Sequence, residues 1–168
     1  MQQNLSQKTN LQHLFSIPVI VAALGYFVDI YDLLLFGIVR VPSLQDMGLS
    51  KEEIGVIGKN ILNWQMGGLL LGGILWGILG DKKGRLSVLF GSILTYSLAN
   101  IGCGFVKDPT TYALLRFIAG IGLAGELGAG ITLVSEVLPK ELRAIGTSIV
   151  AGVGLFGAVA GYFTVELF

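Results

Sequence analysis

Hydrophobic side chains gather along this chain in five long runs that are separated by short polar connections. A helix that crosses a bilayer needs about 20 mostly apolar residues, because each residue adds about 1.5 Å. Every run reaches that length. The pattern therefore predicts an all-α membrane protein with five transmembrane helices, at residues 15–39, 54–79, 86–106, 111–134 and 144–165.

The remaining residues are distributed as a short leader and tight connections. Residues 1–14 are polar and form a predicted cytoplasmic leader, and residues 15–168 form the transmembrane domain. A soluble fold that buries five such runs is excluded, since almost no residues would be left for a polar surface. The sequence stops just after the fifth run, which predicts a truncated domain whose C-terminal helices are missing.

Lysine and arginine indicate the orientation, because cytoplasmic loops carry an excess of both. Five spans place the leader and the second and fourth connections on one side, and this side holds the larger number of basic residues. We therefore expect a multi-pass protein of the plasma membrane (the inner membrane in bacteria) with a cytoplasmic N-terminus. The basic residues are Lys8, Lys82, Lys83, Arg85, Lys140 and Arg143 on that side, and Arg40, Lys51 and Lys107 on the other.

Composition supports lipid as the surroundings and excludes several classes of function. Only 13% of the residues are charged and 53% are hydrophobic, whereas soluble domains carry about 25% charged residues. The net charge is zero and no basic tract is present, so no nucleic-acid partner is expected. One histidine, one cysteine and no evident nucleophile predict neither a metal site, a cofactor nor an enzyme.

Ionisable residues inside a span are candidates for function, because inserting each costs about 2.5–3.5 kcal/mol. Asp29 and Asp32 lie one helical turn apart in the first span and share a face. Arg116 lies about 9 Å below the outer end of the fourth span, and Asp32 about 12 Å below that of the first. An ion pair is therefore expected if the two helices are neighbours. The pair either couples a proton to transport, if a solute displaces the aspartate, or is a static structural contact.

Glu126 is a second candidate in the fourth span. Gly122 and Gly130 lie four residues before and after it, so we expect its side chain to stand on a face cleared of bulk. No cationic partner is evident, which makes Glu126 a candidate proton carrier. The alternative is that it binds a group in the missing helices.

The second connection and its flank form the strongest local pattern. Glycines at 73, 77, 80 and 84 fall on one helical stripe, which predicts close approach of a neighbouring helix. Asp81 is expected at the start of the third helix, where the helix dipole favours an anion. The alternative is an ordinary tight cytoplasmic loop.

The run Gly77-x-x-x-Asp81-x-x-Gly84-Arg85 resembles the loop between helices two and three of the major facilitator superfamily. The resemblance implies a twelve-helix carrier, of which this chain holds the first five helices. It also implies that Asp81, Gly84 and Arg85 latch two six-helix halves together on the cytoplasmic side. Gly73 and Gly77 are assigned to the same conformational role.

The fourth connection resembles a signature that follows helix four in sugar porters and organic-ion carriers. Glu136, Pro139 and Arg143 match its Glu-x-x-Pro-x-x-x-Arg pattern. We expect Pro139 to end the fourth helix, since proline lacks an amide donor. Glu136 is expected to pair with Arg85 across the cytoplasmic mouth and to take part in gating with Arg143. An ordinary solvated charge cluster is the alternative.

Residues 28–32 resemble a stretch of helix one in aromatic acid/proton symporters, with Ile30 in place of a glycine. Tyr31 adds a ring with a hydroxyl group that suits a solute site. In the superfamily, helices one and four line the same cavity, and an arginine at the place of Arg116 is tied to proton coupling. Glu126 in its glycine-rich context resembles organic-ion and metabolite carriers.

The resulting prediction is secondary active transport of a small organic solute with a proton, by alternating access. The fifth span has glycines but lacks the glycine-proline motif of drug/proton antiporters, which favours symport. Two alternatives remain: a non-transporting receptor or scaffold of the same fold, and an inactive truncated carrier. The cost of inserting Asp32, Arg116 and Glu126 disfavours the scaffold.

Overall fold

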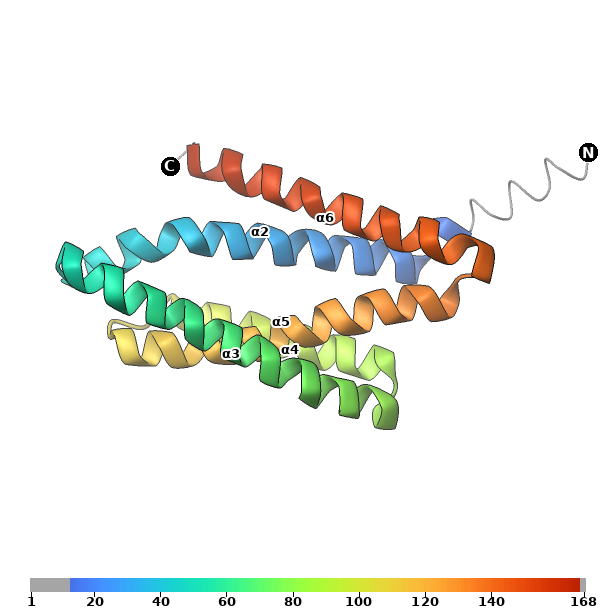
Figure 1. Cartoon of the computed structure of the whole chain (residues 1–168), viewed down its shortest axis with the longest axis horizontal. Coiled ribbons are helices and arrows are strands. Elements are labelled where there is room, and N and C mark those ends of the chain that lie inside the picture. Colours follow the sequence, from blue (N-terminus) through green and yellow to red (C-terminus); the bar gives the residue numbers. More distant parts are fainter. Residues whose placement is uncertain (1–12, 167–168) are drawn as a thin grey trace, which may run out of the picture.

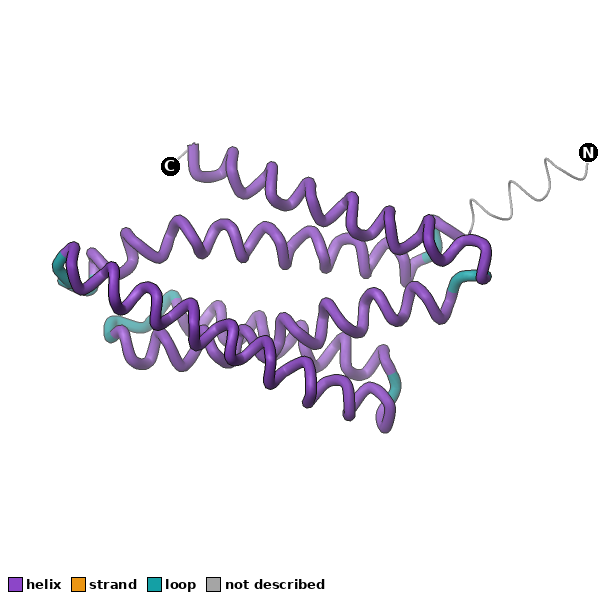
Figure 2. Tube along the Cα trace, viewed as in Figure 1, coloured by secondary structure: helices purple, strands orange, loops and turns teal. Residues whose placement is uncertain are grey.

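The computed structural model describes residues 13–166, and this range is helical apart from short connections and contains no strand (Figure 2). Five of the helices are long and apolar enough to cross a membrane, which confirms the predicted fold class. Residues 1–12 of the predicted leader lie outside the described range. The elements are α2 (Ile17–Asp46), α3 (Lys51–Lys83), α4 (Arg85–Cys103), α5 (Pro109–Val137), the short 3-10 turn η1 (Lys140–Leu142) and α6 (Arg143–Glu166).

Polar caps extend two helices beyond the apolar runs that predicted them. Before α3, the Ser50 amide donates to Glu53 Oε2 at 2.9 Å and the Glu53 amide donates to the Ser50 hydroxyl at 3.4 Å. These bonds form a capping box and hold the pKa of the Glu53 carboxyl below its usual value. Before α5, Asp108 accepts from the Thr111 amide at 3.2 Å. Both helices therefore start earlier than expected, because capping residues are polar and hydropathy does not mark them.

The first helix continues well past the predicted end at residue 39. It runs to Asp46 through Pro42, over residues that were expected to form a connection. Arg40 fixes this extension, since its Nη1 donates to the Gly58 carbonyl of α3 at 3.1 Å. In contrast, α4 ends at Cys103, three residues before the predicted end at residue 106. Gly104 caps its last turn.

The five helices are arranged around α5, which is the most buried of them. Figure 1 shows α2 and α6 side by side, with α3 and α4 packed against α5 and α2 also in contact with it. The parallel α3–α5 contact depends on glycine. A Cβ at Gly72 would lie 2.5 Å from the Ile121 carbonyl, and one at Gly120 would collide with the Gln65 carbonyl. Helices in lipid associate through such close backbone contact.

The α3–α5 contact is not made by the predicted glycine stripe. Gly73 and Gly77 face no side chain or backbone within 4 Å in the described residues. Gly84 lies beyond the end of α3 with a φ of +87°, a conformation that glycine adopts without strain. The packing face instead contains Gly68 and Gly72, about 100° round the helix from Gly73.

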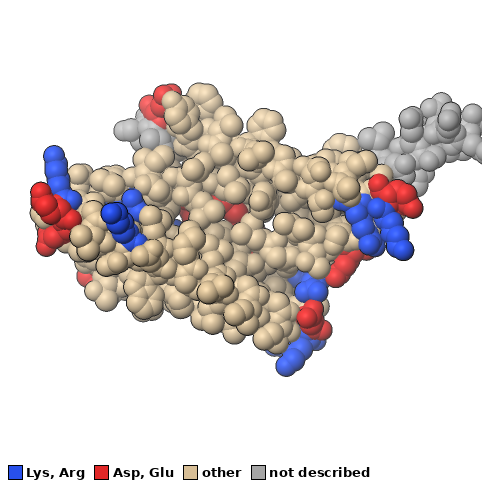
Figure 3. Space-filling model, viewed as in Figure 1, with Lys and Arg blue, Asp and Glu red and all other residues tan. Residues whose placement is uncertain are grey.

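Most charged side chains gather at the two ends of the bundle, and the surface between them is largely uncharged apart from acidic atoms visible in a central hollow (Figure 3). Many large hydrophobic side chains on this surface are exposed, including Phe90, Leu70 and Leu155. Such a surface would be unfavourable in water and suits the hydrocarbon core of a bilayer.

Candidate functional site

The centre of the bundle holds a buried cation, Arg116 of α5, whose side chain contacts two other helices, α2 and α4. Arg116 is only 7% exposed. Nη1 donates to Asn100 Oδ1 of α4 at 3.0 Å and to Asp32 Oδ2 of α2 at 3.4 Å. The guanidinium carbon lies 3.6 Å from the centre of the Phe36 ring. The ion pair expected from matching depths is therefore present, and we call these four residues the central site.

Arg116 has donor capacity to spare in this arrangement. A guanidinium group carries five N–H donors, and its Nε has no partner among the described residues. The bond to Asp32 is long at 3.4 Å, whereas charge-assisted bonds of this kind are typically about 2.7–2.9 Å. Arg116 is thus positioned to accept a second anion, or to exchange Asp32 for one.

Aromatic and amide side chains surround the central site. Phe36 packs edge-on against Tyr112, with ring centres 6.1 Å apart. Tyr96 of α4 is buried beside Asp32 and Asn100. These groups give the site an apolar wall next to hydrogen-bonding groups, a combination typical of small-molecule sites.

Asp29 and Glu126 lie next to each other, one turn from Asp32 towards the N-terminus of α2. Asp29 is fully buried, and neither of its carboxylate oxygens has a partner among the described residues. Glu126 Oε1 lies 2.6 Å from the position that a Cβ would take at Gly25. Gly25 and Asp29 are four residues apart and share a face of α2. Glu126 therefore has a neighbour, the Asp29 carboxyl group, which the sequence did not predict.

The space around Glu126 also differs from the prediction. Gly130 packs against Ala22, and a Cβ at Gly122 would lie 2.6 Å from the Tyr96 amide. Neither glycine leaves an open face beside Glu126. The space for the Glu126 side chain is left by Gly25 on the neighbouring helix α2, and the sequence of α5 alone does not indicate it.

Tyr31 points away from the central site, although it precedes Asp32 in the chain. Its hydroxyl donates to Thr164 Oγ1 of α6 at 3.4 Å. A Cβ at Gly161 of α6 would also contact the Tyr31 ring at 3.8 Å. The structure thus places Tyr31 in the contact between α2 and α6.

The second group of predicted residues lies where α3 and α5 end, at the end of the bundle that the charge pattern predicts to be cytoplasmic. Arg85 Nη2 lies 2.8 Å from Asp81 Oδ1, and Arg85 Nε lies 3.5 Å from Glu136 Oε1. We call Asp81, Arg85 and Glu136 the end cluster. Asp81 belongs to the last turn of α3, not to the start of the third helix, because α3 continues to Lys83 before Gly84 ends it. A cation, not a helix dipole, therefore compensates Asp81.

Pro139 and Arg143 shape the turn that follows α5. The helix ends at Val137, and Pro139 precedes η1. Arg143 Nε donates to the Leu138 carbonyl at 3.1 Å and so satisfies a backbone acceptor that the helix end leaves free. These contacts hold the turn beside Glu136.

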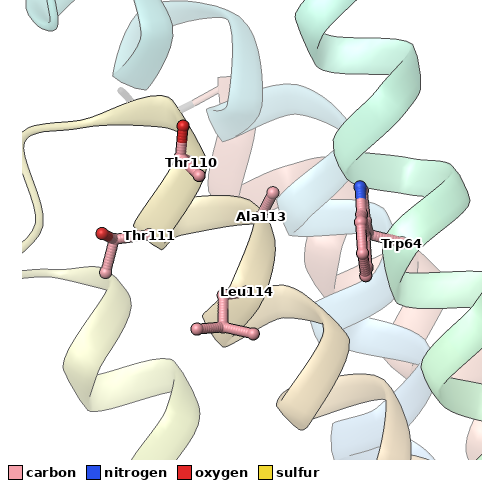
Figure 4. A pocket seen from close by; sticks show the side chains of 5 residues that line it. All are labelled: Trp64, Thr110, Thr111, Ala113 and Leu114. Carbon is pink, nitrogen blue, oxygen red and sulfur yellow. The ribbon is translucent and has the colours of Figure 1, made fainter.

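Several cavities open towards the opposite end of the bundle, and two of them bear on the site. One, of about 230 Å³, lies between Trp64 of α3 and four residues of α5, Thr110, Thr111, Ala113 and Leu114 (Figure 4). It carries no charged side chain. The other, of about 540 Å³, is lined by Asp46, Lys107 and Tyr112 among others. Because the Tyr112 ring also lies 5.9 Å from the Arg116 guanidinium, this larger cavity adjoins the central site.

A family comparison matches most of the chain. The profile of the Major Facilitator Superfamily matches residues 22–167. The chain belongs to this superfamily. The resemblance inferred from residues 77–85 and 136–143 is therefore confirmed, and the chain is a multi-pass membrane protein.

Relatives within the major facilitator superfamily are named as transporters. The niacin transporter NiaP of Acinetobacter baylyi is 34% identical over 88% of this chain, which covers 34% of that protein. The gentisate transporter of Corynebacterium glutamicum is 32% identical over 79% of this chain and 29% of its own length. A Haemophilus influenzae protein named for metabolite transport is 36% identical over 82% of this chain and 33% of its own.

These figures mean that the chain spans about a third of the length of the relatives it matches. No solved structure matched the chain. Membership of a family of transporters agrees with the expectation that the chain is not an enzyme.

Several residues of this major facilitator site were missed in the sequence. Asn100 is a polar side chain inside the third span, and the insertion cost that drew attention to Asp32 would have marked it too. Outside the central site, Gln65 of α3 was also not singled out, although it is 1% exposed and its amide has no partner in the described residues. Phe36 and Gly25 carry no polar signal, so only the contact between helices reveals them.

Proposed function

We propose that this chain forms part of a secondary transporter that moves a small organic anion together with a proton by alternating access. The observation that carries the proposal is Arg116, a buried guanidinium with free donors and a weakly held aspartate. Relatives named for gentisate and niacin, both organic acids, support an anionic solute. The carrier is proposed to lie in a bacterial inner membrane with a cytoplasmic N-terminus and to be completed by further helices.

Binding follows from the shape of the guanidinium group. A carboxylate can accept two parallel bonds from it, which is stronger than the single long bond from Asp32. The rings of Phe36 and Tyr112 lie beside the cation and would pack against an aromatic solute. An aromatic carboxylate is therefore the solute class that suits the site best.

Coupling follows when the solute takes Arg116 away from Asp32. The aspartate then loses its cation in a buried place, and a proton stabilises it there. Solute and proton would thus bind together, which is the requirement for symport. When the solute leaves, Arg116 pairs with Asp32 again and the proton is released.

Conformational change is proposed to depend on the end cluster. Arg85 joins Asp81 at the end of α3 to Glu136 at the end of α5, so movement of the two helices breaks a contact. Gly84, Pro139 and Arg143 fix the two turns that carry these charges. Gly73 and Gly77 are proposed to face the helices that complete the carrier, and Tyr31 to hold α6 against α2.

Replacing Arg85 by glutamine is expected to lower the maximal uptake rate of the intact carrier while leaving KM unchanged. The change is expected to stay below about 30-fold, because the two ion pairs of Arg85 contribute at most about 1 kcal/mol each and about 1.4 kcal/mol corresponds to a factor of ten. Uptake kinetics in proteoliposomes measure it. Lys82→Gln is the matched control, and an equal effect there would assign the loss to net charge and contradict a role for the end cluster.

Uptake into proteoliposomes tests the proposed function itself. Labelled gentisate, niacin and benzoate would be supplied with and without an inward proton gradient. We expect saturable uptake of at least one of these acids and accumulation only with the gradient. Non-saturable flux that ignores the gradient would refute proton-coupled transport.

A further inference from the structure

Two buried carboxyl groups, Asp29 and Glu126, and the partly buried Asp32 lie near a single cation in the middle of this bundle. Asp29 and Asp32 lie one turn apart on α2, and Glu126 of α5 reaches the same face of α2 beside Gly25. Of these three acids, Asp32 is the one that Arg116 contacts. Within residues 13–166, Tyr96 of α4 is the other titratable group beside these acids. No charged side chain of α3 or α6 lies next to Asp29 or Glu126 in this range. Two acids are therefore left without a compensating cation.

We propose that Asp29 and Glu126 form a carboxyl pair that shares a proton and is separate from the anion-binding central site. Two carboxylates side by side in a buried place cannot both remain ionised at moderate cost. A proton on one of them creates a donor, and the other accepts it. This bond would give the Asp29 oxygens, which lack a partner among the described residues, the contact that burial requires.

Gly25 leaves the space in which the Glu126 carboxyl group can lie beside Asp29. A side chain at this position would occupy the place of the Glu126 carboxyl group, since its Cβ would lie 2.6 Å from Oε1. Glycine thus lets the carboxyl end of Glu126 cross to α2, one turn from Asp29. The arrangement differs from the Asp32 contact, in which a cation balances the acid.

In the proposed transporter, the carboxyl pair holds a proton next to Asp32, which needs one when the solute binds. Asp29 and Asp32 are one turn apart on one helix. When the solute takes Arg116 from Asp32, a proton held by the pair passes to Asp32, and the pair then takes up a replacement proton from solution. This link to transport rests on the proposed function, whereas the shared proton itself does not.

Infrared spectroscopy of the full 168-residue chain in lipid nanodiscs tests the shared proton without any transport assay. A protonated carboxyl group has a carbonyl band that a carboxylate lacks. We expect this band at neutral pH in the wild-type chain, and a smaller band in both Asp29→Asn and Glu126→Gln. In each variant the remaining acid should change its titration midpoint by more than about one pH unit, as interacting sites do. Glu52→Gln, an exposed acid of α3, should change nothing.

Gly25→Ala provides a second variant that keeps both acids. It is expected to separate them and to shift the titration as the single substitutions do, with the helical content unchanged by circular dichroism. Identical spectra in wild type and variants, independent midpoints, or a band that responds to sodium instead of pH would overturn the shared proton. Uptake that ignores a proton gradient would instead refute the proposed function and leave the pair standing.

Discussion

Replacing Arg116 by glutamine is expected to reduce solute uptake by the intact carrier by about 100-fold. Removing one partner from a buried charged contact costs about 2–5 kcal/mol, and about 1.4 kcal/mol corresponds to a factor of ten. Glutamine keeps a polar end group near Asn100 but loses the charge that would bind a carboxylate. Initial rates of labelled solute uptake measure the effect.

Arg116→Lys separates the charge from the shape of the guanidinium group. Lysine keeps the charge but cannot form two parallel bonds or stack on Phe36 in the same way. We expect a loss of about tenfold, between wild type and glutamine. Lys51→Gln, an exposed cation at the start of α3, serves as control. If the Arg116→Gln variant is monodisperse and its uptake rate equals that of the wild type, the proposed binding mode is contradicted.

Replacing Gly120 by alanine is expected to destabilise the bundle by about 2 kcal/mol. Its Cβ would collide with the Gln65 carbonyl of α3, and backbone cannot move aside as a flexible side chain can. Overpacking of this kind costs about 1–3 kcal/mol. The midpoint of thermal loss of the monomeric gel-filtration peak measures the change.

Gly128→Ala is the matched control, because it lies on the same helix and no atom outside its own helix lies within 4 Å of its Cβ position. Alanine favours a helix by about 1 kcal/mol over glycine, so this variant should be as stable as wild type or slightly more so. Equal destabilisation of both variants would show that the α3–α5 contact does not depend on close backbone approach.

The five helices were predictable because hydropathy and length depend on the chain alone. Their ends were less so. Ser50 and Asp108 extend helices through polar caps, and α2 passes through Pro42, where composition suggests a connection. The glycine stripe at 73 and 77 did not identify the α3–α5 contact, because spacing shows which residues share a face but not which neighbouring helix that face meets.

The candidate site was predictable in part for the same reason. Insertion cost marks Asp32 and Arg116, and equal depth indicates that they can meet. The neighbour of Glu126 was missed because Asp29 lies on another helix and the decisive residue, Gly25, has no side chain. Tyr31 was placed with its neighbour Asp32, yet successive residues on a helix point about 100° apart.

The most direct test of the central claim is to count protons when a solute binds. In weakly buffered solution, a pH-sensitive dye reports proton exchange as gentisate or niacin is added to the intact carrier. The exchange of Arg116 from Asp32 to the solute carboxylate predicts uptake of about one proton per solute bound. Asp32→Asn should bind solute without taking up a proton. Binding by wild type with no change in pH would contradict the exchange.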